Sequence, residues 1–491
     1  FQGRTTTWAG LRDRVDALAG ALARRGVSFG DRVAVLMTNR PEFLETVLAA
    51  NRLGASAVPI NFRLTAPELV YLLDDSGAEV LVVDEDTARL AQEATAQLGR
   101  PVRAVAVGAS AWDDAEAYEA AMAERGDPVQ LVDVPEDTPA LIMYTSGTTG
   151  RPKGAVLSHR NLQAQAVTII RAWRLCADGD VNLVASPMFH IGAFGSIVAM
   201  ILVGGTLVIE PSGAFDPAEL LEVLERERVT CVFLVPAQWQ ALCAEPSAAQ
   251  RDLSALRMMC WGAAPASETL LRRMAEVFPD ALNVAVFGQT EMSPVTCALE
   301  GEDALRKIGS VGRPVASVAM RVVDAQLNDV PQGEIGEIVY QGPTVMQGYW
   351  RNPEATEQAF AGGWFHSGDL VRVDDEGFVY VVDRVKDMII SGGENIYCAE
   401  VENALAAHPD IVEVGVIGRP HPKWGETPVA VAALRDGATL DIEALRTWAT
   451  GSLARYKLPT VLEIVPALPR NAAGKVAKEA LRQRYARPEG G

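Results

Sequence analysis

Short apolar runs alternate with helix-like segments along the first part of the chain, and this alternation limits the fold more than any other feature. Buried strands are expected at 33–37, 57–60 and 80–83, with a helix between each strand and the next. The same pattern returns between residues 183 and 287. Strands joined by helices pair in parallel and are covered on both faces. The sequence therefore predicts an α/β fold with two doubly wound sheets in one large N-terminal domain.

The remainder of the chain divides into two further patterns. Between residues 310 and 383, short alternating strands are separated by turns rich in Gly and Pro, which predicts a small antiparallel β subdomain. After residue 384, a glycine-containing loop precedes a mixture of helices and strands that is long enough for a separate α+β domain. We therefore expect an N-terminal domain at 1–383 and a C-terminal domain at 384–491.

The net charge and the cysteines exclude several classes of protein. The chain has 63 acidic against 44 basic residues, a formal net charge of −19. A nucleic-acid surface needs clustered Lys and Arg, so nucleic acid is not an expected partner. Any anionic ligand must instead be held by a local group of donors. The six cysteines include no CxxC pair, which favours reduced thiols over a disulfide framework or a zinc site.

No integral membrane segment is expected. The longest stretch without a charged side chain, residues 181–209, is interrupted by several glycines and by His190, so it is interpreted as two core strands and a helix. Without a secretory signal pattern, a cytoplasmic protein is expected. Peripheral contact with a membrane and a homodimer both stay open.

A loop dense in hydrogen-bond donors follows the apolar strand at 141–143. It runs from Tyr144 to Gly154 (YTSGTTGRPKG) and brings together hydroxyl groups, glycines and the ammonium of Lys153. Such a loop suits phosphate oxygens, although a flexible polar turn is the alternative interpretation. It does not match the pattern GxxxxGK[ST], because Pro152 stands where the second glycine should be. A P-loop kinase, which would release ADP, is therefore disfavoured.

This loop resembles the phosphate loop of the AMP-forming adenylating enzymes, the superfamily of acyl-CoA synthetases, peptide-synthetase adenylation domains and luciferases. Four further strings resemble the other motifs of that superfamily in the expected order: GAAP at 262–265, FGQTE at 287–291, GWFHSGD at 363–369 with DRVKD at 383–387, and PRNAAGK at 469–475. The resemblance covers essentially the whole chain. It implies ATP and CoA as co-substrates, Mg²⁺ as the metal, and a small mobile C-terminal domain.

The resemblance also implies a nucleotide site. Phe287 and the turn at 262–265 can sandwich a purine, although the superfamily usually has tyrosine at that position. Asp369 would accept the ribose hydroxyls, and Glu291 beside phosphates is explained by a hard cation such as Mg²⁺. The alternative interpretation of Glu291 is a solvated surface side chain, and that of Asp369 and Arg384 is an ordinary turn or ion pair. The expected nucleotide-binding residues are Thr145, Ser146, Gly147, Thr148, Thr149, Lys153, Gly262, Ala263, Ala264, Phe287, Gly288, Gln289, Thr290, Asp369 and Arg384.

Three lysines carry the expected catalytic cycle. Only seven of the 44 basic residues are lysines, so a retained lysine is more often one that needs a compact ammonium. By the resemblance, Lys475 bridges the attacking carboxylate and the nucleotide, while Lys153 and Glu291 complete the catalytic set. Lys386 matches the hinge about which the C-terminal domain rotates between two steps. That rotation would present a path for CoA formed by Gly392, Gly393 and Trp424.

The acyl pocket is expected at the segment Pro187-Met-Phe-His190 with Ile191 and Gly192, which resembles the part of the family that gates the acid site. Relatives that activate amino acids usually have an aspartate near this segment, and here the residues are Phe189 and His190. A hydrophobic monocarboxylic acid is therefore predicted, with a fatty acid favoured. An aryl-CoA ligase and an enzyme that loads a carrier-protein thiol are the alternatives. A non-catalytic acyl-nucleotide sensor is the alternative from another class, and His190 by itself could be a core histidine.

Overall fold

The structure is a computed structural model that describes residues 1–109, 112–124, 133–145, 151–176, 179–392, 394–470 and 475–486. By its contacts the chain forms two compact units. The first comprises Phe1–Met320, Tyr340–Phe365 and Gly377–Val379, and the second comprises Arg321–Val339, His366–Glu376 and Tyr380–Gly491. The expected boundary between residues 383 and 384 stays a prediction.

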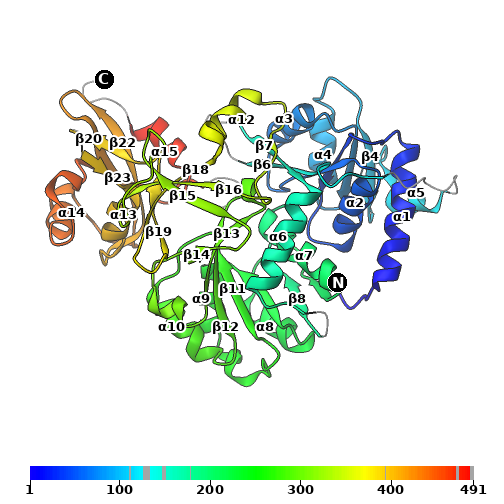
Figure 1. Cartoon of the computed structure of the whole chain (residues 1–491), viewed down its shortest axis with the longest axis horizontal. Coiled ribbons are helices and arrows are strands. Elements are labelled where there is room, and N and C mark those ends of the chain that lie inside the picture. The colour runs from blue at the N-terminus through cyan, green and yellow to red at the C-terminus, as the bar shows by residue number, and fades with distance from the viewer. Residues whose placement is uncertain are drawn as a thin grey trace. The chain divides into compact units, whose positions relative to one another are not determined.

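The first unit contains an eight-stranded sheet with the strand order β17-β7-β6-β2-β1-β3-β4-β5. Its strands β4, β6 and β7 are labelled in Figure 1. Strands β1 to β5 and β6 pair in parallel where they adjoin, and β7 runs antiparallel to both β6 and β17. The strands are β1 (Arg32–Leu36), β2 (Ser56–Pro59), β3 (Val80–Asp84), β4 (Arg103–Val107), β5 (Glu116–Ala117), β6 (Pro139–Thr145), β7 (Lys153–Ser158) and β17 (Gly348–Tyr349).

Five helices accompany this sheet: α1 (Trp8–Arg24), α2 (Pro41–Arg52), α3 (Ala66–Ser76), α4 (Ala88–Thr95) and α5 (Tyr118–Ala123). The helix α3 begins with a capping box between Thr65 and Glu68 and ends at Gly77, whose φ of 67° favours glycine. Leu69 and Leu72 of α3 pack against Leu36 of β1 and its neighbours. Strand β3 is buried along its whole length, as expected for a strand covered on both faces.

A seven-stranded sheet completes the first unit, in the order β14-β13-β12-β11-β10-β8-β9. Its strands from β8 to β12 pair in parallel, whereas β13 is antiparallel to β12 and to β14. This second sheet confirms the predicted pair of doubly wound sheets. The strands are β8 (Val181–Val184), β9 (Thr206–Ile209), β10 (Cys231–Leu234), β11 (Met258–Gly262), β12 (Leu282–Gly288), β13 (Val295–Glu300) and β14 (Arg313–Pro314).

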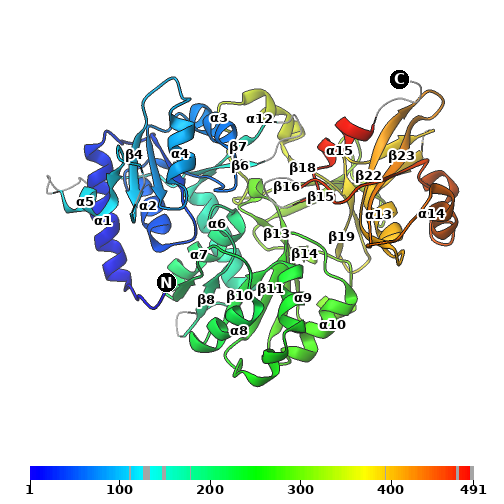
Figure 2. The same cartoon turned by 180° about the vertical axis from the view of Figure 1, so that it is seen from behind.

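Helices α6 (His159–Ala172) and α7 (Ile191–Val203) lie side by side and share a core with this sheet (Figures 1 and 2). The α7 helix begins directly after His190, which is extended at φ −92°, and ends at Gly204 with φ 71°. Its start is therefore fixed at the segment expected to form the acyl pocket. The other helices of this unit are α8 (Pro217–Arg226), α9 (Pro236–Ala244), α10 (Glu268–Val277), α11 (Asp303–Arg306) and α12 (Pro353–Ala359), with short 3₁₀ turns η1 (Pro246–Gln250), η2 (Thr290–Met292) and η3 (Ala361–Gly363).

Most of a four-stranded sheet belongs to the second unit, with the order β15-β16-β18-β19. A five-stranded sheet follows, in which the long strands β22 and β23 are antiparallel and β24 is parallel to β23. The elements are β15 (Ala319–Val323), β16 (Gly336–Gln341), β18 (Phe365–Val373), β19 (Val379–Arg384), β20 (Ile389–Ser391), β21 (Glu394–Ile396), β22 (Ile411–His421), β23 (Gly425–Leu434), β24 (Val461–Ile464), α13 (Cys398–Ala406), α14 (Ile442–Ala449), α15 (Lys478–Tyr485) and η4 (Arg455–Lys457).

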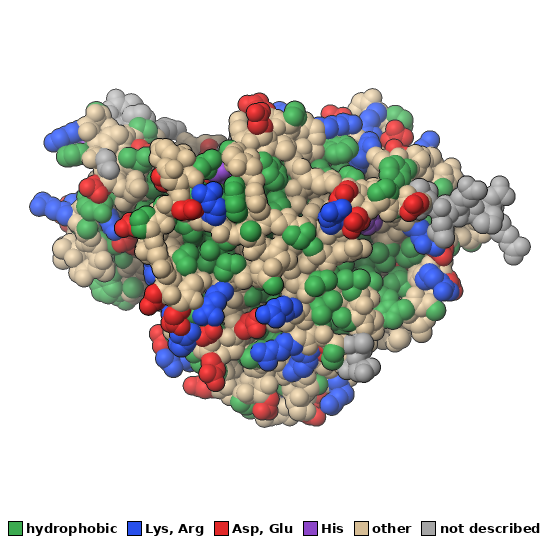
Figure 3. All heavy atoms as spheres, in the orientation of Figure 1, with side chains coloured by type: hydrophobic (Ala, Val, Ile, Leu, Met, Phe, Trp, Pro, Cys, Tyr) green, Lys and Arg blue, Asp and Glu red, His purple; other side chains and the backbone are tan. Residues whose placement is uncertain are grey.

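Charged side chains of both signs are interspersed on the face that Figure 3 shows. Charges of opposite sign also pair along helices, such as Arg89 with Glu93 in α4 and Arg272 with Glu268 in α10. The acidic excess therefore does not gather into one single-sign patch on that face. Within the described part of the chain, no helix has both the length and the apolar character needed to cross a membrane.

Candidate active site

The base of the expected phosphate loop is a β6–β7 hairpin. Thr145 pairs with Lys153 across it, and Tyr144 pairs with Gly154. A Cβ on Gly154 would lie 2.8 Å from Cγ2 of Ile142, so a side chain there would crowd Ile142. The expected loop residues Ser146, Gly147, Thr148 and Thr149 lie outside the described residues.

Glu291 lies in the η2 turn beside this hairpin and is only 7% exposed. Its Oε1 accepts a hydrogen bond from Oγ1 of Thr145 at 3.0 Å and another from the hydroxyl of Tyr349 at 3.1 Å. Burial, together with the Glu291 carboxylate, raises the pKa of Tyr349. The ammonium nitrogen of Lys153 lies 5.1 Å from the centre of the Tyr349 ring, a cation–π distance. The structure thus brings Thr145, Lys153 and Glu291 together around Tyr349.

Sequence reasoning missed Tyr349. It lies on the short strand β17, which pairs with β7, and 58 residues separate it from Glu291. A tyrosine between Gly348 and Trp350 carries no local sign of a polar role.

Glu291 fits a magnesium ion that takes most of its ligands from elsewhere. Among the described residues, no group of three or more His, Cys, Asp or Glu side chains could hold a metal. Mg²⁺ commonly binds one or two carboxylates and completes its shell with water and substrate phosphates. A single buried carboxylate beside Thr145, at the base of the expected phosphate loop, is consistent with that mode of binding.

The expected purine site lies at the carboxyl ends of β11 and β12. Gly262 pairs with Val286, and a Cβ on Gly262 would lie 2.3 Å from the Val286 carbonyl oxygen. Gly288 has φ 159°, and a Cβ there would lie 1.8 Å from the Pro294 carbonyl oxygen. Both positions therefore require glycine. This pairing sets two expected groups of nucleotide-binding residues beside each other: Gly262, Ala263 and Ala264, and Phe287, Gly288, Gln289 and Thr290.

In the second unit, the charged groups of Asp369, Arg384 and Lys475 lie close enough to influence one another. Nε of Arg384 lies 2.7 Å from Oδ1 of Asp369, which is only 4% exposed. Arg384 also donates to the carbonyl of Ser367 at 3.0 Å. Part of the Lys475 side chain is exposed to solvent. Burial of its ammonium among protein atoms lowers the pKa of that group, and the nearby Arg384 guanidinium lowers it further. The Asp369 carboxylate acts in the opposite direction. The expected ribose contacts and the expected catalytic lysine therefore lie together.

The expected hinge, Lys386, is exposed and is attached to the last helix through its backbone. Arg482 of α15 donates to the Lys386 carbonyl at 3.3 Å and pairs with Asp387 at 2.5 Å. On the same helix, Lys478 pairs with Glu402 at 2.8 Å. Burial lowers the pKa of Lys478, but Glu402 outweighs that effect and the net pKa is raised. The helix that follows Lys475 is thus tied to the hinge segment.

Two of the residues expected along the CoA path are in contact. The backbone N–H of Gly392 donates to the Trp424 carbonyl at 2.7 Å. Gly392 has φ 62°, and a Cβ there would lie 3.0 Å from Cε3 of Trp424. The Trp424 ring is 45% exposed, with the Lys423 ammonium 4.4 Å from its centre. Gly393 lies outside the described residues.

The expected acyl segment forms a group of rings at the start of α7. The rings of Phe189 and His190 are 4.3 Å apart, and Phe62, from the loop after β2, meets Phe189 edge-on at 5.3 Å. Ile191 is buried, whereas a Cβ on Gly192 would meet none of the described atoms within 4 Å. Space therefore lies beside Gly192. Phe62 was missed by sequence reasoning because it lies in a loop of the other sheet, far from this segment in the chain.

The comparisons with known proteins agree with these motifs. The AMP-binding enzyme family matches residues 1–350, and the AMP-binding enzyme C-terminal domain family matches residues 400–475. The chain therefore belongs to the AMP-binding enzyme family, and the predicted class, an ATP-dependent acid–thiol ligase of the acyl-CoA or aryl-CoA type, is confirmed. Enzymes of this class use ATP and CoA.

The relatives include ligases for aromatic and for aliphatic acids. A feruloyl-CoA synthase of Amycolatopsis sp is 43% identical over 98% of this chain and 94% of its own. An indoleacetate–CoA ligase of Aromatoleum aromaticum is 40% identical over 99% of this chain and 94% of its own. A long-chain-fatty-acid–CoA ligase of Mycobacterium tuberculosis is 36% identical over 98% of this chain and 93% of its own. The fatty acid favoured by the sequence is therefore not confirmed as the substrate.

Among solved structures, o-succinylbenzoate CoA synthetase from Bacillus subtilis, in complex with its acyl-adenylate intermediate, is similar with a TM-score of 0.86. It is 32% identical over 98% of this chain and 93% of that chain. This likeness confirms the predicted fold class, a large N-terminal and a small C-terminal domain.

Proposed function

We propose that the protein activates a hydrophobic monocarboxylic acid that carries an aromatic ring, and then transfers the acyl group to CoA. The observation that carries the choice of acid is the group of rings formed by Phe62, Phe189 and His190 beside the open space at Gly192. Aromatic rings favour edge-on contacts with one another, so such a group favours a ring in the ligand. The two relatives named for aromatic acids, at 43% and 40% identity, support the same choice.

An amino acid or a dicarboxylic acid is disfavoured. The segment from Pro187 to Ala193 contains no acidic residue that could pair with an ammonium group, and Val286 offers no charge to a second carboxylate. An unpaired charge in an apolar site costs several kcal/mol, about the scale of burying an isolated polar or charged group. A fatty acid stays the second candidate, because α7 behind the ring group is built almost wholly from apolar residues.

In the first step, the substrate carboxylate attacks the α-phosphorus of ATP. A carboxylate oxygen–phosphorus bond forms, the bond to the β-phosphate breaks, and pyrophosphate leaves. The task of the protein is to position the reactants and to stabilise negative charge on phosphate oxygens. The proposal assigns Thr145 and Lys153 to the phosphates and Lys475 to the oxygens of the attacking carboxylate and the α-phosphate. Asp369, held by Arg384, is assigned to the ribose.

Glu291 would hold a magnesium ion. When bound, the ion neutralises charge on the phosphate oxygens. Thr145 and Tyr349, by donating to Oε1 of Glu291, fix the orientation of its carboxylate.

In the second step, the thiol of CoA attacks the acyl carbon of the acyl-adenylate, and AMP leaves with the oxygen that joined it to the acyl group. The proposal places pantetheine beside Gly392 and Trp424 after a rotation about Lys386, which also withdraws Lys475. A side chain at position 392 would crowd the half-exposed Trp424 ring, whereas glycine leaves room there, and this supports passage of a narrow chain.

A panel of acids tests this function. Pyrophosphate release is measured with aromatic acids, such as substituted cinnamates and arylacetates, and with straight-chain acids of the same carbon number. A higher kcat/KM for the aromatic acids, with AMP released in a CoA-dependent manner and no carrier protein, is expected. A preference for the straight-chain acids selects the second candidate. Activity only with an acyl-carrier protein would select the carrier-loading alternative, and no pyrophosphate from any acid would contradict the enzyme assignment.

A further inference from the structure

The side-chain amide of Asn39 holds the segment that leads into the expected acid site. Asn39 follows β1 and is 3% exposed. Its Nδ2 donates to the carbonyl of Ser186 at 3.0 Å, and its Oδ1 accepts from the backbone N–H of Met188 at 2.8 Å. A single side chain from the first sheet therefore brackets the backbone that follows β8 of the second sheet.

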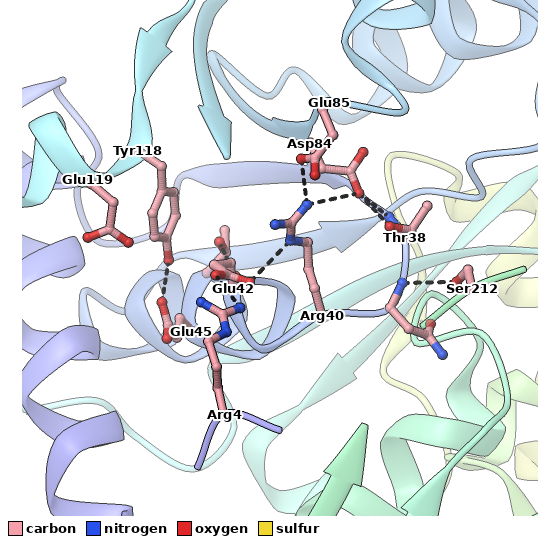
Figure 4. Close-up of polar contacts among 12 residues, drawn as sticks. Arg4, Thr38, Arg40, Glu42, Glu45, Asp84, Glu85, Tyr118, Glu119 and Ser212 are labelled. Atoms are coloured by element: carbon pink, nitrogen blue, oxygen red, sulfur yellow. Dashed lines mark hydrogen bonds and ion pairs between the residues drawn. The ribbon is translucent and has the colours of Figure 1, made fainter. Parts of the chain in front are cut away.

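The residues on either side of Asn39, Thr38 and Arg40, are both held by carboxylates (Figure 4). The N–H and the hydroxyl of Thr38 donate to Oδ2 of Asp84 at 2.7 and 2.6 Å, and Asp84 at the end of β3 is fully buried. The guanidinium of Arg40 pairs with Glu42 at 3.1 Å and with Glu85 at 2.7 Å. The N–H of Asn39 donates to Oγ of Ser212 at 3.0 Å.

The second carboxylate oxygen of Asp84 also accepts hydrogen bonds, so the carboxylate is held on both sides. Oδ1 of Asp84 accepts from the N–H of Thr87 at 3.1 Å and from its hydroxyl at 2.8 Å. A carboxylate that accepts several hydrogen bonds is held in one orientation. Thr38, and with it Asn39, is therefore anchored to β3 rather than to a mobile loop.

The segment held by Asn39 places the ring group of the acid site. Phe189 and His190 follow Met188 directly, and the N–H of His190 donates to the Pro187 carbonyl at 3.0 Å. The turn between Ser186 and His190 is thus fixed at one end by Asn39 and at the other by the start of α7. A shift of the Met188 backbone would move the ring of Phe189 against Phe62.

We propose that Asn39 is a positioning residue for the acid substrate, which it serves by holding Ser186 and Met188 so that Phe189 and His190 line the site. This inference rests on the proposed function, in which that segment forms the acid site. An amide is suited to the task because it donates and accepts at once, whereas a carboxylate only accepts. Removing the donor leaves the half-buried carbonyl of Ser186 without that partner.

Asn39→Asp is the test variant, since it keeps the shape and the acceptor but places an oxygen against the Ser186 carbonyl. The matched control is Asn51→Asp, because the Asn51 amide also bonds two carbonyls, those of Ala55 at 3.2 Å and Ala140 at 2.8 Å, away from the acid segment. In pyrophosphate-release assays, Asn39→Asp is expected to raise the KM for the acid by roughly tenfold, the factor that about 1.4 kcal/mol gives, and to leave the KM for ATP within about twofold. Asn51→Asp is expected to change neither KM.

Ser212→Ala is the milder second variant should Asn39→Asp fail to fold. It removes the acceptor of the Asn39 N–H from a half-buried position. A smaller rise in the acid KM, still without a change in the ATP KM, supports the proposal. Unchanged acid KM in every Asn39 or Ser212 variant that folds overturns it and leaves Asn39 with a purely structural role.

His190→Ala, assayed in parallel, separates failure of this inference from failure of the proposed acid site. If His190→Ala alters the acid KM while Asn39→Asp behaves like Asn51→Asp, the inference is wrong and the acid site stands. If neither His190→Ala nor Asn39→Asp alters the acid KM, the acid site itself is misplaced and both proposals fall. A selective rise in the acid KM in both variants supports both.

Discussion

The hydroxyl of Tyr144 donates to Oδ2 of Asp75 at 2.5 Å, so helix α3 holds the residue that precedes Thr145 and the expected phosphate loop. The same helix holds the other end of the loop, because the hydroxyl of Tyr71 donates to the Pro152 carbonyl at 3.0 Å. Burial and the Asp75 carboxylate raise the pKa of Tyr144, so its hydroxyl stays protonated as the donor. One helix therefore fixes both stems of the β6–β7 hairpin.

The first prediction concerns Tyr144→Phe, which removes the bond to Asp75 without changing the ring. The stems of the phosphate loop should then be less well held, and the KM for ATP is expected to rise by roughly tenfold, the factor for about 1.4 kcal/mol, while the KM for the acid stays unchanged. Steady-state pyrophosphate release with each substrate varied in turn measures both constants.

Tyr118→Phe is the matched control for this prediction. The hydroxyl of Tyr118 donates to the buried Glu45 at 2.8 Å, so the variant loses a similar tyrosine–carboxylate bond in the same unit (Figure 4). It should lower the free energy of unfolding without changing the KM for ATP. Equal effects of the two variants on the ATP KM would show that α3 does not position the loop.

The second prediction separates the two steps at Lys475. Lys475→Ala should slow adenylation by roughly 10² or more, the scale of losing one donor to a developing charge, because no other ammonium is assigned to the attacking carboxylate. Thioester formation from supplied acyl-adenylate should stay largely intact. Single-turnover assays of each step measure the two rates, with Lys307→Ala as a control that removes a lysine outside every assigned site. An equal loss in both steps contradicts the assignment.

The strands and helices were the part of the fold that the sequence predicted best. The strands expected at 33–37, 57–60 and 80–83 occur at Arg32–Leu36, Ser56–Pro59 and Val80–Asp84, because burial on both faces leaves a local apolar pattern. The length of β22, Ile411–His421, is set instead by its pairing with β23. Pairing partners are not encoded in the pattern of one strand.

The contacts that orient the site residues could not be predicted in the same way. Asn39 and Met188 are 149 residues apart in the chain, and Tyr144 and Asp75 are 69 apart. Nothing in the residues around Asn39 indicates which backbone its amide will meet, because that depends on how the two sheets adjoin. The motifs therefore identified the groups that carry charge, whereas the side chains that hold those groups emerged only from the fold.

The third prediction concerns the pH dependence of adenylation. Burial and Arg384 lower the pKa of Lys475 below that of a free lysine, so its ammonium is lost earlier as the pH rises. Because the protonated form is the donor, the rate of adenylation should fall on the alkaline side as the pH passes through this lowered pKa. Arg384→Gln removes a neighbouring positive charge and frees the Asp369 carboxylate, both of which raise the pKa of Lys475. The alkaline limb should then move to higher pH.

Lys475→Arg is the control for that pH profile. A guanidinium stays protonated over the whole range, so any activity this variant retains should lack the alkaline limb. The profile of the adenylation rate, measured in single turnovers to keep the second step out of view, gives the position of the limb. A limb that persists unchanged in Lys475→Arg would assign it to another group.

The fourth prediction concerns the hinge. Lys386→Pro fixes φ at the position about which the C-terminal domain is expected to rotate, and it leaves the carbonyl that Arg482 contacts at 3.3 Å in place. If the fixed backbone favours the arrangement in which Lys475 lies beside Asp369 and Arg384, adenylation should continue and thioester formation should fall by roughly tenfold or more. Lys386→Ala keeps the backbone free and should change neither step by much, so it controls for loss of the ammonium. Single-turnover rates are measured for each step. Unchanged overall turnover in Lys386→Pro would remove Lys386 from the cycle. An equal fall in the rate of thioester formation in Lys386→Ala would assign the effect to the lysine side chain.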